Sequence, residues 1–163
     1  MNLRLNSSLA LGLALAVGSA QSGTLVAPVP YNDYLVFEAG QVCDFPVEFS
    51  ASGALQEFVT KEGRFISMAR GVGNTITNQL DPTKTYSSQA GGRLELWTLA
   101  SADTLIETQG QVYYFSEESA SNPGGRGLWL LDGSWQAAID EQGDPAQPLT
   151  GKGRRVDLCR LLR

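Results

Sequence analysis

From Leu35 onward, the chain is a succession of short segments in which apolar and polar residues alternate, separated by turns rich in Gly, Asn and Asp. After residue 20, no stretch of useful length repeats its apolar residues at the helical period. In 43–50 (CDFPVEFS), Phe45, Val47 and Phe49 are expected to point inward and the residues between them to face solvent. This pattern predicts an all-β fold of about eight to ten short strands.

The remaining strands are expected between turn residues. They are 55–61, 64–70, 75–80, 85–89, 93–99, 105–107, 111–116, 128–131, 135–139 and 155–162. The pair Glu62-Gly63 predicts a hairpin between the first two of these strands. Gly110 is a candidate bulge position, because an isolated glycine inside a strand pattern often marks one.

The first twenty residues have the three parts of a secretory signal peptide. Arg4 gives the start a positive charge, residues 9–17 (LALGLALAV) form an apolar run, and residues 18–20 are small. The apolar run is too short to span a bilayer, which needs about 20 residues, and this pattern is typical of a segment that is removed on export. We therefore expect a secreted, extracellular protein that begins near Gln21.

The chain that follows the signal has the length of one domain. Residues 21–34 are small and polar, and Pro28 and Pro30 argue against a helix, so an extended N-terminal arm is expected there. The expected organisation is a signal peptide over 1–20, the arm over 21–34 and a β-barrel domain over 35–163.

The two cysteines, Cys43 and Cys159, lie near the two ends of the expected domain. In an exported protein they favour a structural disulfide over a reactive thiol, because no neighbouring base or helix N-terminus is evident to lower a thiol pKa. Such a bridge would place the first and last strands side by side. The expected fold is therefore a single antiparallel barrel of about eight strands closed by one disulfide.

Strand alternation leaves one conflict in this fold. It puts Cys43 on the inward face, but it puts Cys159 on the face opposite to Val156 and Leu158. A disulfide between paired strands needs both cysteines on one face. Either a bulge near 44–46 restores the match, or Cys159 lies beyond the end of regular pairing.

Charge and residue types exclude several classes of function. The net charge is −5 and the chain has no histidine. A negatively charged domain is a poor partner for nucleic acid or for an anionic membrane surface, and no later apolar run is long enough for a membrane helix. Without histidine, Ser-His-Asp and Cys-His sites cannot form, and the commonest zinc ligand is missing. We expect no cofactor.

Carboxylates remain as acid–base groups, and no pair of them stands out. Alternation places Glu95 outward, in a solvated position. The acidic turn 140–144 (DEQGD) lacks the spacing of an EF-hand loop and is explained as well by a solvated hairpin. No catalytic residue and no metal site are assigned.

Several short motifs are spread over nearly all of 43–162. They are CDFPVEF at 43–49, the pair Gly63-Arg64, the step Thr77-Asn78, DEQG at 140–143 and DLCRLL at 157–162. Together they resemble a group of small secreted actinobacterial proteins without an assigned activity. The resemblance implies an exported β-barrel similar to the dirigent and allene-oxide-cyclase barrels, and it implies no substrate.

Three aromatic residues on expected strands, Tyr114, Trp129 and Trp135, are the candidate ligand-binding residues. If they face one interior, they line an apolar cavity with a few polar tips, as in small-molecule sites. The alternative is a filled core, because a barrel of about eight strands is just wide enough for side chains to fill. The glycine-rich loop 117–127 is expected to be either a binding loop or a surface loop without a partner.

Three functions are compatible with these features. The leading prediction is a secreted, non-enzymatic barrel protein that binds a small apolar ligand in the barrel mouth. The alternative is a cell-surface structural or interaction protein with a packed barrel and an exposed apolar patch. A cyclase- or hydrolase-like enzyme with a buried carboxylate rests on fold analogy alone.

Overall fold

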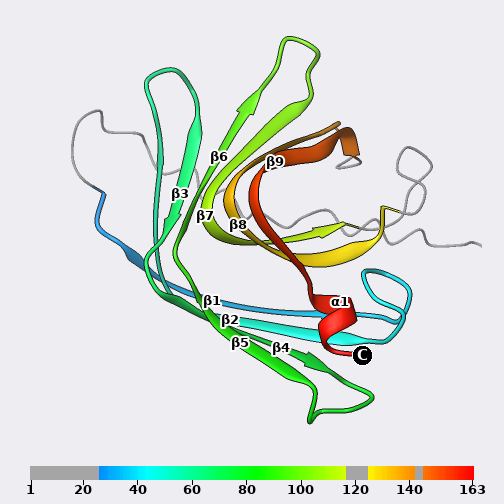
Figure 1. Ribbon diagram of the computed structural model, residues 1–163. Helices are drawn as coiled ribbons and strands as arrows, with labels where there is room; N and C mark the ends of the chain where they lie inside the picture. Colours follow the sequence, from blue (N-terminus) through cyan, green and yellow to red (C-terminus); the bar gives the residue numbers. More distant parts are fainter. Residues whose placement is uncertain (1–25, 117–124, 142–144) are drawn as a thin grey trace, which may run out of the picture.

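The computed structural model describes residues 26–116, 125–141 and 145–163 (Figure 1). This part of the chain is all-β with one short helix. Its elements are β1 (Val29–Phe37), β2 (Val47–Val59), β3 (Phe65–Ala69), β4 (Val72–Asn78), β5 (Thr85–Ala90), β6 (Gly92–Thr98), β7 (Thr104–Ser116), β8 (Gly127–Ile139), β9 (Pro145–Asp157) and α1 (Leu158–Leu161). The expected signal peptide at 1–20 and most of the loop 117–127 lie outside the described residues.

The nine described strands form one antiparallel sheet. β3 and β4 lie end to end along β2, because residues 65–69 pair with 55–59 and residues 73–78 pair with 47–52. β5 and β6 continue this arrangement, since β5 pairs with β4 and β6 pairs with β3. The sheet is therefore seven strands wide, in the order β1, β2, β3 with β4, β6 with β5, β7, β8 and β9. The predicted hairpin at Glu62-Gly63 is confirmed as the turn between β2 and β3.

β1 begins inside the segment that was expected to be an extended arm. Val29 pairs with Leu55 and Phe37 pairs with Val47, so β1 runs antiparallel to β2 along its whole length. Residues 29–34 therefore belong to the sheet. Pro30 is compatible with this position, because β1 is an edge strand and one of its sides needs no partner.

The expected closure into a barrel is not confirmed. Every pair in the sheet is antiparallel and the sheet is seven strands wide, so its outermost strands β1 and β9 run in the same direction. An antiparallel ladder cannot join two such strands, and no pairing joins them within the described residues. β5 is a further edge strand, because β4 is its one partner in the described sheet. The sheet is open, and it curves until its two ends face each other (Figure 1).

A row of glycines crosses four neighbouring strands. Gly92 pairs with Gly110, Gly110 with Gly133, and Gly133 with Gly153. At Gly110 φ is 81°, and a Cβ there would lie 2.6 Å from the carbonyl oxygen of Gly91, so only glycine is accommodated without strain. The row lies at the middle of β7 and β8, which curve strongly along their length (Figure 1). The β7–β8 register passes through Gly110 without a shift, so the bulge expected there is absent from this pairing.

The core fills the space between β1, β2 and β4 on one side and β7, β8 and α1 on the other. Aromatic pairs connect the two sides: the ring centroids of Phe37 and Phe115 are 5.2 Å apart, and those of Phe49 and Tyr113 are 5.4 Å apart. Burying such side chains is the main favourable contribution to folding. The inward positions predicted in CDFPVEFS are confirmed, since all three side chains are buried: Phe45, Val47 and Phe49.

The prediction of a strand over 155–162 is wrong in its second half. β9 ends at Asp157, whose carboxylate accepts a hydrogen bond at 3.0 Å from the backbone N–H of Arg160 and so caps α1. Leu158 and Leu162 are both fully buried. A strand would put Arg160 on the same face as these two leucines, whereas the helix turns the exposed Arg160 away from them.

Cys43 and Cys159 form a disulfide with their Cα atoms 5.4 Å apart, which confirms the predicted bridge. Neither cysteine belongs to a strand, because Cys43 lies between β1 and β2 and Cys159 lies in α1. The conflict of faces is thereby resolved, since Cys159 is beyond the end of regular pairing. The expected side-by-side placement of the first and last strands is not confirmed, because the bridge joins α1 to the β1–β2 connection. No helix in the described ranges is long and apolar enough to cross a membrane.

Candidate functional site

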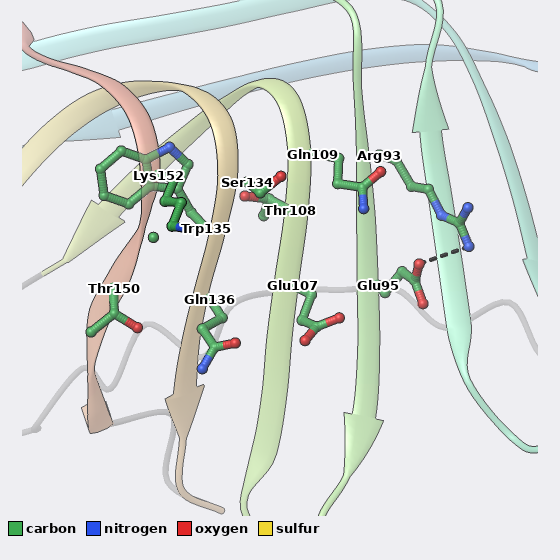
Figure 2. A pocket seen from close by; sticks show the side chains of 11 residues that line it. Arg93, Glu95, Glu107, Thr108, Gln109, Ser134, Trp135, Gln136, Thr150 and Lys152 are labelled. Atoms are coloured by element: carbon green, nitrogen blue, oxygen red, sulfur yellow. Dashed lines mark ion pairs between the residues drawn. The ribbon is translucent and has the colours of Figure 1, made fainter.

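A polar cleft of about 460 Å³ lies across β6, β7, β8 and β9 (Figure 2). Side chains at positions i and i+2 of a strand point to the same face, so each of these strands contributes one residue to each of two cross-strand rows. The first row is Arg93, Gln109, Ser134 and Lys152. The second row is Glu95, Glu107, Gln136 and Thr150.

Charges are unevenly distributed in the cleft. On β6, Arg93 Nη2 lies 2.7 Å from Oε1 of Glu95, and Arg64 Nη1 lies 3.8 Å from the other carboxylate oxygen. Glu107 lies directly opposite Glu95 on β7. At the β9 end, Lys152 forms no salt bridge with any described residue. The solvated position expected for Glu95 is wrong, because its side chain is only 15% exposed and is ion-paired.

Trp135 and Thr108 also border the cleft, but each lies between two row residues of its strand, so alternation points its side chain to the opposite face of the sheet. A Cβ on Gly151 would lie 2.8 Å from Cδ2 of Trp135, so the indole occupies the space that a side chain at position 151 would need. Three buried polar side-chain atoms of the described chain have no hydrogen-bond partner: Arg93 Nε, Thr108 Oγ1 and Trp135 Nε1. Each of these atoms can donate a hydrogen bond, and each is shielded from solvent, so none of them is exposed in the cleft.

Two of the three predicted aromatic ligand-binding residues lie together. Tyr114 and Trp129 are cross-strand partners whose rings stack with centroids 5.8 Å apart, and the Arg155 guanidinium lies 4.7 Å from the Trp129 ring. Burial raises the pKa of Tyr114, against the opposing effects of a hydrogen bond with Ser116 and the charge of Arg155. Trp135 lies further along β8 and lines the cleft instead, so the three residues do not form one site.

The charged and amide residues of the cleft were not among the predicted site residues. Their signal is a polar residue at every second position of four consecutive strands: Arg93-x-Glu95, Glu107-x-Gln109, Ser134-x-Gln136 and Thr150-x-Lys152. Each pair alone indicates only a solvated strand face. The strand register is what aligns the four pairs into two rows.

The cleft combines cationic donors, neutral amides and hydroxyls, and carboxylate acceptors, a set that suits a ligand with both donors and acceptors. Within the part of the chain that the structure describes, no group of three His, Cys, Asp or Glu side chains could hold a metal ion. Residues 142–144 of the acidic turn lie outside that part. Comparison of the chain with family models, with curated proteins and with solved structures finds no match.

Proposed function

We propose that this protein is a binding module that holds a small polar ligand in the cleft across β6–β9. The observation that carries the proposal is the alignment of two cross-strand rows of charged, amide and hydroxyl side chains along one cleft. A ligand with several donors and acceptors can form hydrogen bonds with both rows at once.

The lining favours a polar ligand over the apolar ligand that the aromatic residues alone suggest. Both rows consist of polar or charged side chains, and Trp135 is the one aromatic residue among the cleft residues described. The volume falls within the range of about 300–1,000 Å³ that is typical of small-molecule sites. Binding is favoured over acid–base catalysis, because the Glu95 carboxylate is engaged by Arg93 and Arg64.

We also propose that the protein is exported. The three-part pattern of residues 1–20 supports this proposal. The Cys43–Cys159 disulfide agrees with it, because disulfides form and persist in oxidising compartments.

Intact mass spectra of the protein secreted from a bacterial host test both proposals. The denaturing mass gives the site of signal removal, and extra mass in the native spectrum alone reveals a retained ligand. We expect Gln136→Ala, in the cleft, to lose that ligand and Gln89→Ala, an exposed glutamine on β5, to keep it. The binding proposal fails if no ligand is retained and if no sugar, amino acid or nucleotide raises the Tm.

One observation favours a second candidate function, an interaction through the exterior. Of the seven exposed large apolar side chains in the described chain, four lie on or just before the edge strand β1: Val26, Val29, Tyr34 and Val36. Exposed apolar groups at a free sheet edge can pair with another chain. If the protein associates, sedimentation should show a monomer for the double variant Tyr34→Ser/Val36→Ser and no change for Leu80→Ser.

A further inference from the structure

We propose that the ligand of the cleft is an acidic saccharide, a short chain of pyranose rings that carry carboxylates. This inference rests on the proposed binding function and adds the class of ligand. In this arrangement Lys152 pairs with a ligand carboxylate, while Glu107 and Gln136 form hydrogen bonds with ring hydroxyls.

Lys152 supplies the anion-binding position. It is exposed and forms no salt bridge with a described residue, and Figure 2 shows it with Trp135 at the β9 end of the cleft. Arg154 and Arg155 follow it on β9, so this strand is basic in a chain whose net charge is −5. A local concentration of positive charge on an acidic protein selects an anionic partner.

The second row supplies groups that suit hydroxyls. The Glu107 carboxylate accepts hydrogen bonds, the Gln136 amide donates and accepts them, and a saccharide hydroxyl does both. Glu95 and Glu107 are directly opposite each other, and like charges in this position repel. Hydroxyl donors placed between them would offset the repulsion, whereas an inorganic anion would add to it.

The first row has a cationic donor at each end. Arg93, whose Nη2 is ion-paired with Glu95, stands at one end, and Lys152 stands at the other. Four neighbouring strands spaced about 4.8 Å apart span about 14 Å, which suits a short oligosaccharide better than a single small anion.

Calorimetric titration of the secreted protein tests the inference with uronic acid tetrasaccharides of the gluco, galacto and manno series. Each is paired with the neutral tetrasaccharide that carries a hydroxymethyl group in place of the carboxylate. We expect at least one acidic tetrasaccharide to bind about two- to fivefold more tightly than its neutral partner, because this is the contribution of an ion pair with an exposed lysine. High salt should reduce this preference.

The variant Lys152→Met should abolish the preference for the acidic member of the pair, and Lys84→Met, in the turn between β4 and β5, should leave it unchanged. Both lysines are exposed, and unfolding transitions that match the wild type would show that the fold is kept. Glu107→Gln should weaken the binding of acidic and neutral tetrasaccharides alike.

Three outcomes would overturn the inference. Equal binding of acidic and neutral partners, or an unchanged preference in Lys152→Met, would exclude an acidic saccharide and leave the cleft as a binding site. The same conclusion would follow if no saccharide binds but the wild-type protein retains a small molecule that the variant Gln136→Ala loses. If no saccharide binds and no ligand is retained or stabilises the protein, the proposed function fails as well.

Discussion

Gly133 has a φ of 131° at the middle of β8, and a Cβ placed there would collide with the carbonyl oxygen of Lys152 on β9. A side chain at this position must therefore shift one of the strands or hold a rarely allowed conformation. We expect Gly133→Ala to lower the free energy of unfolding by about 1–3 kcal/mol. Urea unfolding monitored by tryptophan fluorescence measures this change.

Gly91 provides the matched control, because no atom lies within 4 Å of a Cβ built there. Gly91→Ala should leave the free energy of unfolding within about 0.5 kcal/mol of the wild type. A similar loss in both variants would contradict the special role of the glycine row (Gly92, Gly110, Gly133 and Gly153) in bending the sheet.

Tyr113 is expected to make the folded protein less stable at alkaline pH. Burial raises its pKa, against the opposing effect of its hydrogen bond with Ser88. A raised folded-state pKa means that the folded protein holds the phenolic proton more tightly than the unfolded chain does. The resulting stabilisation is complete below about pH 10, the ordinary tyrosine value, and it is lost as pH rises through the folded-state pKa.

We therefore expect the Tm to fall above about pH 10, and to fall less steeply in Tyr113→Phe, which has no phenolic proton to lose. Thermal unfolding followed by circular dichroism across this pH range measures both slopes. Parallel slopes for the two proteins would show that Tyr113 does not contribute to the alkaline loss.

Among the secondary-structure elements, α1 depends on its cap. The Asp157 carboxylate accepts the Arg160 N–H, and Leu158 anchors the helix in the core. Replacing a capping residue by alanine costs about 1 kcal/mol, so Asp157→Ala should lower the free energy of unfolding by about that amount. Asp157→Asn should restore most of the loss, because asparagine is also a good cap. If alanine and asparagine behave alike in urea unfolding, the cap is not the cause.

The outermost strands β1 and β9 differ in how well their side chains prevent pairing with a further strand. β9 contains Pro145, Pro148 and Lys152, residues that discourage pairing with a further strand. β1 has Pro30 near its start but then exposes Tyr34 and Val36. Association of this protein with another chain is therefore favoured at β1, which is where the second candidate function places it.

For the whole molecule, the disulfide is the main covalent constraint on the unfolded chain. It joins residues 116 positions apart, and in the chain-entropy model such a cross-link stabilises a fold by about 4–5 kcal/mol, before strain is subtracted. We expect the double variant Cys43→Ala/Cys159→Ala to lose about 2–5 kcal/mol. Urea unfolding of the wild type with reductant should give the same midpoint as the variant. A midpoint equal to that of the oxidised wild type would contradict this role.

Much of the fold could be predicted from local pattern. Phe45, Val47 and Phe49 alternate with polar residues, and an alternating segment has only one face to bury. The hairpin at Glu62-Gly63 depends on turn residues next to each other in the chain. The disulfide could be predicted because an exported chain with two cysteines has one intramolecular pairing available.

The candidate site could be predicted only in part. Trp135 was chosen from its residue type and borders the cleft, while its role in ligand binding stays a prediction. Tyr114 and Trp129 were identified by the same reasoning, but the register stacks them on each other beneath Arg155. Residue type indicates what a side chain can bind, whereas the strand register decides which side chains lie next to it.

The sequence by itself determined the strand content, the inward positions of the strand before residue 50 and the pairing of Cys43 with Cys159. The first two features depend on residues that are close together in the chain, and the third follows because the chain has only two cysteines. The tertiary structure alone decided the open sheet, the short C-terminal helix and the cleft. An odd number of antiparallel strands excludes closure by an antiparallel pair, and no parallel pair joins β1 to β9 within the described residues. The cleft exists because long-range register brings Arg93 and Lys152 into one row, and packing of the whole chain selects that register.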